Sequence, residues 1–144
     1  MFGMATQRDL EVMDKFFSEF IQFVTNKSNS FDFNEKSSNS NVNSILNKWA
    51  VMASELDRRS KDDMKVMGEI VLTTDKVEQG IYKCRVNAKT GNPMIQTLAN
   101  TINKMVDVTE KNMNELRSVL KSYTTNDFKP LIDIDPMLKE DLLK

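Results

Sequence analysis

Three long segments of this chain space their apolar residues in alternating steps of three and four, as helices do when they pack along one stripe. Only 4 Gly and 3 Pro occur among the 144 residues, so few positions would interrupt a helix. The sequence therefore predicts an all-α protein of long helices rather than a turn-rich β fold.

We expect these helices over residues 6–26, 42–79 and 94–122. In the second and third segments, two consecutive steps of four interrupt the alternation, which locally unwinds a left-handed supercoil. We call the stripe along which the helices are expected to pack the predicted seam. It consists of Leu10, Met13, Phe17, Phe20, Val24, Val42, Ile45, Trp49, Met52, Leu56, Met67, Ile70, Val77, Ile95, Leu98, Ile102, Met105, Leu116 and Leu120.

Two non-helical segments separate the expected helices. Residues 27–41 are rich in Ser and Asn and form either a disordered linker or a connector; Phe31 and Phe33, two apart, favour a connector that docks alternate side chains on helices. Gly80 is expected to end the second helix, because glycine commonly follows a helix C-terminus. The connector that follows has Tyr82 and Val86 as its apolar anchors.

The second connector is long enough to return along its helix. Residues 80–93, fully extended, reach roughly 45 Å, whereas a helix of about 16 residues is only about 25 Å long. The two flanking helices can therefore run parallel. Because two parallel helices bury little surface alone, we expect two chains to form a parallel four-helix coiled-coil bundle, a homodimer.

The pieces recur along the chain. Tyr82 and Val86 follow the second helix, four apart, and Phe128 and Ile132 follow the third helix, also four apart. Asn47-Lys48-Trp49 and Asn103-Lys104-Met105 lie early in the second and third helices. The repeating unit is thus helix, connector, helix, with each last helix serving as the first of the next unit.

This order of elements resembles the HAMP domain of bacterial receptors, in tandem copies. Gly80-Ile81-Tyr82 stands where that family has Gly-Asp-Leu, and Asn103-Lys104-Met105 where it has Asn-x-Met. The amino-acid sequence of the chain further resembles the linker of methyl-accepting chemotaxis proteins from ε-class bacteria. One departure is Asn92-Pro93-Met94, which replaces the acidic-Glu-Gly element that usually opens the family's second helix.

The resemblance implies a degenerate HAMP-like unit over residues 8–58, a full unit over 62–123 and the start of a further, truncated unit over 113–144. It implies chemotactic signal transduction: relay of a conformational change between membrane helices upstream and a kinase-controlling hairpin downstream. In the family, this region lies at the cytoplasmic face of the inner membrane. The alternative is a stand-alone structural or adaptor coiled coil that does not switch.

Composition argues against other functions. The chain has no His, which is the commonest general base and metal ligand, and we find no glycine-rich loop or nucleophile motif, so we expect neither an enzyme nor a cofactor, metal or small-molecule substrate. The net charge is −1 and the basic residues are dispersed, so no nucleic-acid partner is expected. We find no apolar run that would span a membrane, and we expect a cytosolic chain or cytosolic part.

Some residues leave two interpretations open. Cys84 lies between Lys83 and Arg85 and could be a redox sensor, although a passive connector thiol is the favoured interpretation. Arg58, Arg59 and Lys61 could contact a phosphate, but the acidic residues around them favour a solvated helix face. Similarly, Glu78-Gln79 resembles a receptor methylation pair and is better explained as an exposed helix end.

Overall fold

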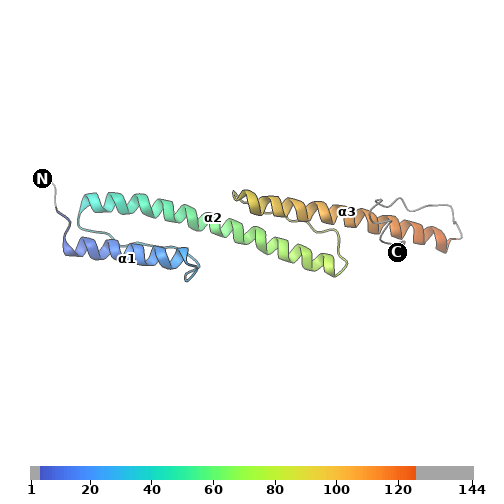
Figure 1. Cartoon of the computed structure of the whole chain (residues 1–144), viewed down its shortest axis with the longest axis horizontal. Coiled ribbons are helices and arrows are strands. Elements are labelled where there is room, and N and C mark those ends of the chain that lie inside the picture. The colour runs from blue at the N-terminus through green and yellow to red at the C-terminus, as the bar shows by residue number, and fades with distance from the viewer. Residues whose placement is uncertain (1–3, 126–144) are drawn as a thin grey trace. The chain divides into compact units, whose positions relative to one another are not determined.

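The computed structural model describes residues 4–125 of the chain. Over these residues the protein is all-α, with α1 (Gln7–Val24), α2 (Ser40–Glu78) and α3 (Pro93–Thr124) and no strand (Figure 1). This confirms the predicted all-α class, and the three expected helices are present within two residues at each end. Phe128, Ile132 and most of the expected third unit lie outside the described residues.

Local sequence signals explain where the helices begin and end. Thr6 caps α1 in a capping box, because its side chain accepts from the Asp9 N–H while the Asp9 carboxylate accepts from the Thr6 N–H. Asn92 caps α3 by accepting from the Met94 N–H at 3.1 Å, with Pro93 in the first turn. Gly80 has φ +82° and follows α2, as a left-handed helix cap requires.

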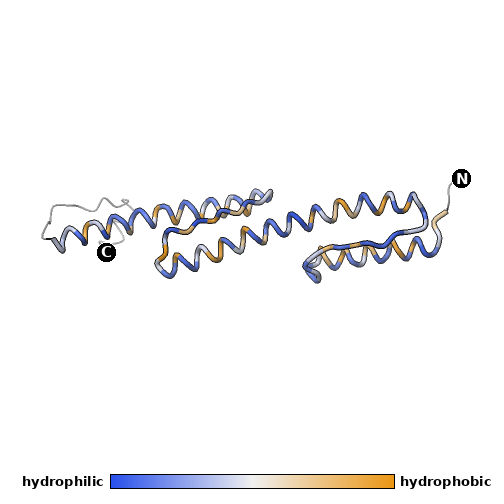
Figure 2. The backbone as a smooth tube through the Cα atoms, turned by 180° about the vertical axis from the view of Figure 1, so that it is seen from behind, coloured by the Kyte–Doolittle hydropathy of each residue, from blue (hydrophilic) through white to orange (hydrophobic). Residues whose placement is uncertain are grey.

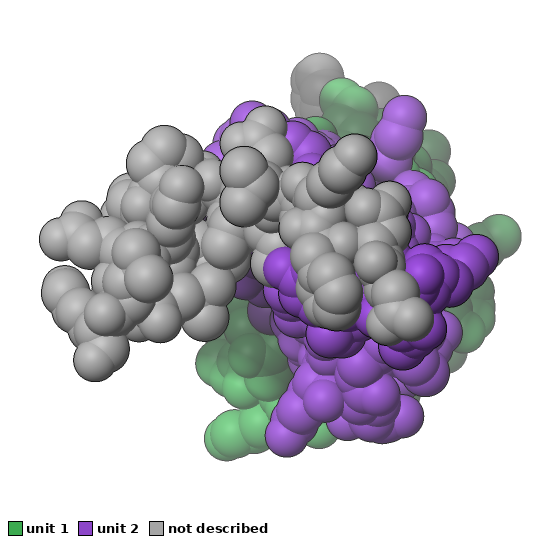
Figure 3. Space-filling view, turned by 90° about the vertical axis from the view of Figure 1, so that its right-hand side faces the viewer, with its two compact units in different colours: residues 1–63 green, residues 64–144 purple. Residues whose placement is uncertain are grey.

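The chain forms two compact units, Met1–Asp63 and Met64–Lys144, which Figure 3 shows in different colours. The first part of α2 belongs to the first unit and the remainder to the second. Figure 2 shows hydrophobic and hydrophilic residues alternating along each helix, as expected for helices with one packed face.

The first unit packs α1 against the beginning of α2. Its core contains Val12 and Phe16 of α1 and Val42 and Leu46 of α2. The two helices run in the same direction, as Figure 1 shows. The segment between them returns along α1 and places two aromatic side chains, Phe31 and Phe33, against this core.

The second unit repeats this arrangement with the end of α2 and with α3. Its core contains Val66 and Ile70 of α2, Val86 of the connecting segment and Ala99 of α3. Ala88, Ile95 and Ile102 pack against this core. The two helices again run parallel, and the connecting residues 79–92 return between them (Figure 1).

Candidate functional site

In the described part of the second unit, five polar side chains fix the connecting segment to both helices. We call this group the connector clamp. It consists of Glu69 of α2, Arg85 of the segment, and Asn103, Asp107 and Glu110 of α3.

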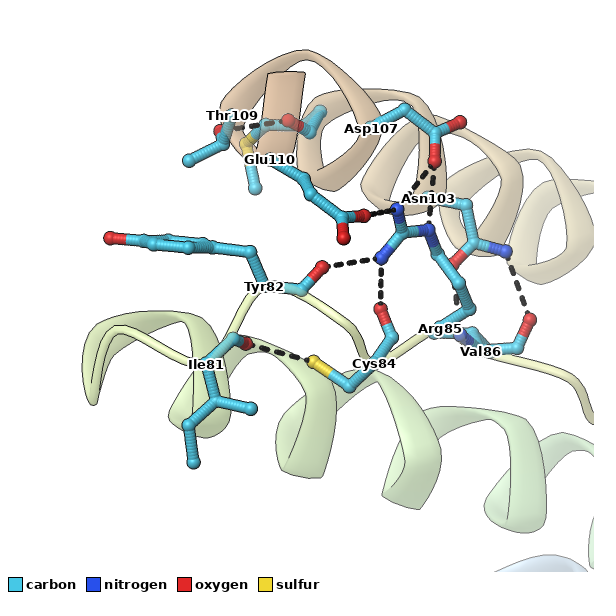
Figure 4. Close-up of polar contacts among 10 residues, drawn as sticks. Ile81, Tyr82, Cys84, Arg85, Val86, Asn103, Asp107, Thr109 and Glu110 are labelled. Atoms are coloured by element: carbon cyan, nitrogen blue, oxygen red, sulfur yellow. Dashed lines mark hydrogen bonds and ion pairs between the residues drawn. The ribbon is translucent and has the colours of Figure 1, made fainter. Parts of the chain in front are cut away.

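Asn103 holds the connecting backbone by both ends of its amide. Its Oδ1 accepts from the Val86 N–H at 2.8 Å, and its Nδ2 donates to the Val86 carbonyl at 2.9 Å (Figure 4). These bonds satisfy the polar backbone of a residue whose own side chain is buried in the core. The side chain of Val86 is therefore held in the core, and Asn103 fixes the position of the Val86 backbone along α3.

Arg85 joins the connecting segment to α3 and also braces the segment itself. Its guanidinium donates to Asp107 at 2.8 Å and to Glu110 at 2.7 Å, and its Nη1 donates to the carbonyls of Tyr82 and Cys84 (Figure 4). The hydrogen bond that Arg85 donates to Glu110 chiefly raises the pKa of Arg85, and the hydrogen bond and charge of Asp107 add to this effect. A planar guanidinium suits this multiple bonding, which the single ammonium of a lysine would not reproduce.

Glu69 holds the segment from the α2 side. Its Oε2 accepts from the backbone N–H of Asn87 at 2.7 Å and of Ala88 at 2.8 Å. The hydrogen bonds from Ala88 and Asn87 hold the pKa of Glu69 below its ordinary value. The connector clamp thus bonds one connecting segment to two helices, through ion pairs and hydrogen bonds with α3 and hydrogen bonds with α2.

The Cys84 thiol lies half-buried beside the clamp. It donates to the Ile81 carbonyl at 3.3 Å (Figure 4). Its sulfur also lies 3.7 Å from the Thr73 carbonyl oxygen. Both contacts are with backbone oxygens, which fits the favoured interpretation of a structural thiol.

The first unit secures its connecting segment with a different set of residues. The Asp9 side chain is buried and accepts from the Ser37 hydroxyl, while Asn43 of α2 accepts from the Ser37 N–H and donates to its carbonyl, each at 2.7 Å. The hydrogen bond from Ser37, followed by that from Thr6, lowers the pKa of Asp9. Asn47, which the sequence repeat pairs with Asn103, is exposed. The hydrogen bonds to the connecting backbone come instead from the side-chain amide of Asn43.

Aromatic packing does most of the joining in the first unit. The ring of Phe16 lies 5.3 Å from that of Phe31, 5.1 Å from Phe33 and 6.0 Å from Trp49, measured between centroids. An ion pair between Lys15 of α1 and Glu35 of the segment adds to this packing and raises the pKa of Lys15. Both units thus combine an apolar core with polar bonds to the connecting segment, and the first differs in that aromatic rings form much of its core.

The charged middle of α2 has its cations neutralised within the helix. Arg58 pairs with Glu55 and Asp62, each at 2.8 Å, and Lys61 pairs with Asp57 at 2.7 Å. Hydrogen bonds from Arg58 and then Arg59 lower the pKa of Glu55 to about 2. This arrangement favours a solvated face over a phosphate site.

The predicted seam divides into two groups in a single chain. Val42 and Ile70 are buried, and seven others are partly buried: Met13, Phe20, Trp49, Val77, Ile95, Ile102 and Leu116. The remaining ten are exposed: Leu10, Phe17, Val24, Ile45, Met52, Leu56, Met67, Leu98, Met105 and Leu120. One chain by itself therefore leaves about half of this stripe in solvent.

Sequence reasoning missed the residues that form most of the core within a chain. The predicted seam does not include the buried residues Val12, Phe16, Leu46, Ala53, Val66, Ala99, Val106 and Val119. They form a second stripe beside the predicted seam, spaced at helical intervals. The signal that could have found them is small size, since Val and Ala predominate where a connecting segment and two helices approach closely.

The described residues contain no group of three or more Cys, Asp or Glu side chains arranged to hold a metal. Within the same residues, no helix has the length and hydropathy needed to cross a membrane. Comparison with known proteins finds no matching family model, curated protein or solved structure.

Proposed function

We propose that this chain is a dimeric signal-relay segment, built from tandem HAMP-like units, that passes a conformational change from a membrane sensor to a kinase-controlling module of a chemoreceptor. The observation that carries the proposal is the pairing of two features in each unit. Parallel helices are joined by a bonded connecting segment, and the predicted seam along those helices is left half exposed.

A second copy of the chain is the partner that this exposed stripe fits. Leu10, Phe17 and Ile45 of the first unit are 41–52% exposed, although each follows the spacing of a coiled-coil seam. Packing the same stripe of another chain against it would turn two parallel helices into four and supply the surface that each unit lacks. The proposed assembly is a parallel homodimer, without catalysis, cofactor or nucleic acid.

Two polar residues interrupt the predicted seam: Thr74 lies four residues after Ile70, and Thr109 lies four residues after Met105. The hydroxyl of Thr74 donates to the Ile70 carbonyl at 3.0 Å, and that of Thr109 to the Met105 carbonyl at 2.8 Å. Both bonds lie within one helix, so a shift of the neighbouring helix breaks neither. Two arrangements can then differ by only a few kcal/mol, and a displacement entering at α1 can select between them.

A helix-phasing experiment separates relay from the alternative, a static adaptor. A parallel dimeric leucine zipper is fused before Gln7, and one to seven residues are inserted at the junction, each turning α1 by about 100° relative to the zipper. The readout is disulfide formation at Met105→Cys in α3, on a Cys84→Ser background. Lys104→Cys, its exposed neighbour, is the matched control.

Relay predicts that disulfide yield at Met105→Cys rises and falls with the number of inserted residues and returns near seven, the heptad repeat. A static adaptor predicts one yield for all insertions. A yield that is constant, and equal to that of Lys104→Cys, would contradict the relay proposal.

A further inference from the structure

Asn112 of α3 is a polar residue at a position where the preceding turns of the helix present apolar side chains. Seven residues, about two helical turns, separate it from Met105, and the same seven separate Met105 from Leu98. Leu98 and Met105 belong to the predicted seam and are 42% and 49% exposed. Because a coiled-coil seam repeats every seven residues, Asn112 takes the next place along it.

Following the seam through Asn112 also removes its irregularity. The steps of three and four alternate without a break through Leu98, Ile102, Met105, Thr109, Asn112 and Leu116. Two consecutive steps of four arise only when Met113 is counted as the member after Thr109. Met113 instead follows the fully buried Val106 by seven residues and continues the stripe that packs within the chain.

The side-chain amide of Asn112 is partly buried and has no hydrogen-bond partner among residues 4–125. The polar residue before it on the seam, Thr109, is satisfied within its own helix, because its hydroxyl donates to the Met105 carbonyl at 2.8 Å. An amide carries both donor N–H groups and an acceptor oxygen, so it is complementary to an identical amide. Asn112 thus brings unused hydrogen-bonding capacity to the seam.

Asn112 also lies where α2 no longer accompanies α3. The core of the second unit contains Ile70 of α2, and Ile102 of α3 packs against this core. α2 ends at Glu78, eight residues after Ile70, whereas Asn112 follows Ile102 by ten residues. Since parallel α-helices rise equally per residue, Asn112 lies close to or just past the last turn of α2. From this point the α3 helices of two copies can approach each other directly.

We propose that Asn112 forms hydrogen bonds with Asn112 of a second copy, and that this amide pair fixes the parallel, in-register alignment of the two α3 helices. The inference rests on the proposed function, because it requires the homodimer. A shift by one heptad, or a reversal of one helix, would place the amide against an apolar residue such as Met105 and leave it without its partner. A single asparagine in an otherwise apolar seam specifies register and the number of chains in this way, at a cost in stability.

Introducing opposite charges at position 112 tests the pairing. The dimer dissociation constant of the full chain is measured by sedimentation equilibrium for Asn112→Asp, for Asn112→Lys and for their equimolar mixture. Like charges that face each other should raise the dissociation constant of each variant alone on the order of tenfold or more. In the mixture the two charges are opposite, so the dissociation constant should return close to that of the unaltered chain.

Asn114→Asp and Asn114→Lys, at an exposed position on another face of α3, are the matched controls and should leave dimerisation unchanged. Circular dichroism follows the helix content of each variant. Equal dissociation constants for the Asn112 variants and the unaltered chain would overturn the inference, as would weaker dimers that do not recover on mixing. In both cases the unaltered chain still dimerises, whereas an unaltered chain that is monomeric would contradict the homodimer itself and this inference with it.

Discussion

Asn103 and Val86 are joined by a pair of hydrogen bonds, one from each end of the Asn103 amide to the N–H and carbonyl of Val86, at 2.8 and 2.9 Å. Val86 lies outside any helix or strand, so its backbone N–H and carbonyl have no partner in regular secondary structure. The Asn103 side chain on α3 supplies that partner. The bonds link the register of the connecting segment to that of the helix, which is a property that the proposed relay requires.

Asn103→Ala should therefore destabilise the second unit. It leaves the N–H and carbonyl of Val86 without their partners, so we expect a loss of about 2 kcal/mol in the free energy of unfolding. Urea unfolding followed by far-ultraviolet circular dichroism measures the change. Asn100→Ala, on the exposed side of the same helix, is the control, and equal stability of the two variants would contradict the role of Asn103.

Replacing Gly68 or Gly80 by alanine should change the stability of the protein in opposite directions. Gly80 has φ +82°, and a Cβ there would meet no atom within 4 Å, so Gly80→Ala costs only backbone strain, about 1 kcal/mol. Gly68, inside α2, also has open space, so Gly68→Ala should stabilise by up to about 1 kcal/mol through helix propensity. Thermal unfolding of both variants tests the prediction, and a common sign would contradict it.

Phe16 and Phe17 should affect different equilibria although they are neighbours. Phe16 is 2% exposed in the aromatic cluster, so Phe16→Ala should lower the stability of the first unit by about 3 kcal/mol at any protein concentration. Phe17 is 41% exposed on the predicted seam, so Phe17→Ala should act mainly by weakening dimerisation. Trp49, the only tryptophan, reports unfolding by fluorescence, and concentration-independent loss for both variants would argue against a seam role for Phe17.

Acid should loosen the second connecting segment through Glu69. Hydrogen bonds from Ala88 and Asn87 place its folded-state pKa below the ordinary value of 4.5. Its contribution is therefore complete above pH 4.5 and is lost as the pH falls through the lower folded-state value. Glu69→Gln should flatten the decline of stability below this pH, whereas Glu78→Gln at the exposed end of α2 should not; equal acid sensitivity in all three proteins would refute the assignment.

Local patterns in the sequence were sufficient to predict the helices. Gly80 ends α2 as predicted, and Phe31 and Phe33 pack on Phe16 as their alternation suggested. These features depend on residues close together in the chain or on a single strong preference. The three-and-four spacing located the three helices, whereas the role of the predicted seam between two chains stays a prediction.

The connector clamp could not be found by the same means. Arg85 and Asp107 lie 22 residues apart, and Asp9 and Ser37 lie 28 apart, with no motif to link them. Such pairs are determined by how far a segment returns along its helix, which periodicity does not encode. The buried stripe was missed for a related reason, because the larger residues of the predicted seam dominate the pattern beside the smaller Val66, Ala99 and Val106.

Dipolar spectroscopy between identical spin labels tests the proposed parallel homodimer most directly. Single cysteines replace Met52 in the first unit or Met105 in the second, which are 54% and 49% exposed, on a Cys84→Ser background. Same-direction helices from two copies predict a short label-to-label distance at both positions. The absence of a dipolar signal at concentrations where the chain is fully folded, or long distances at both positions, would contradict the account.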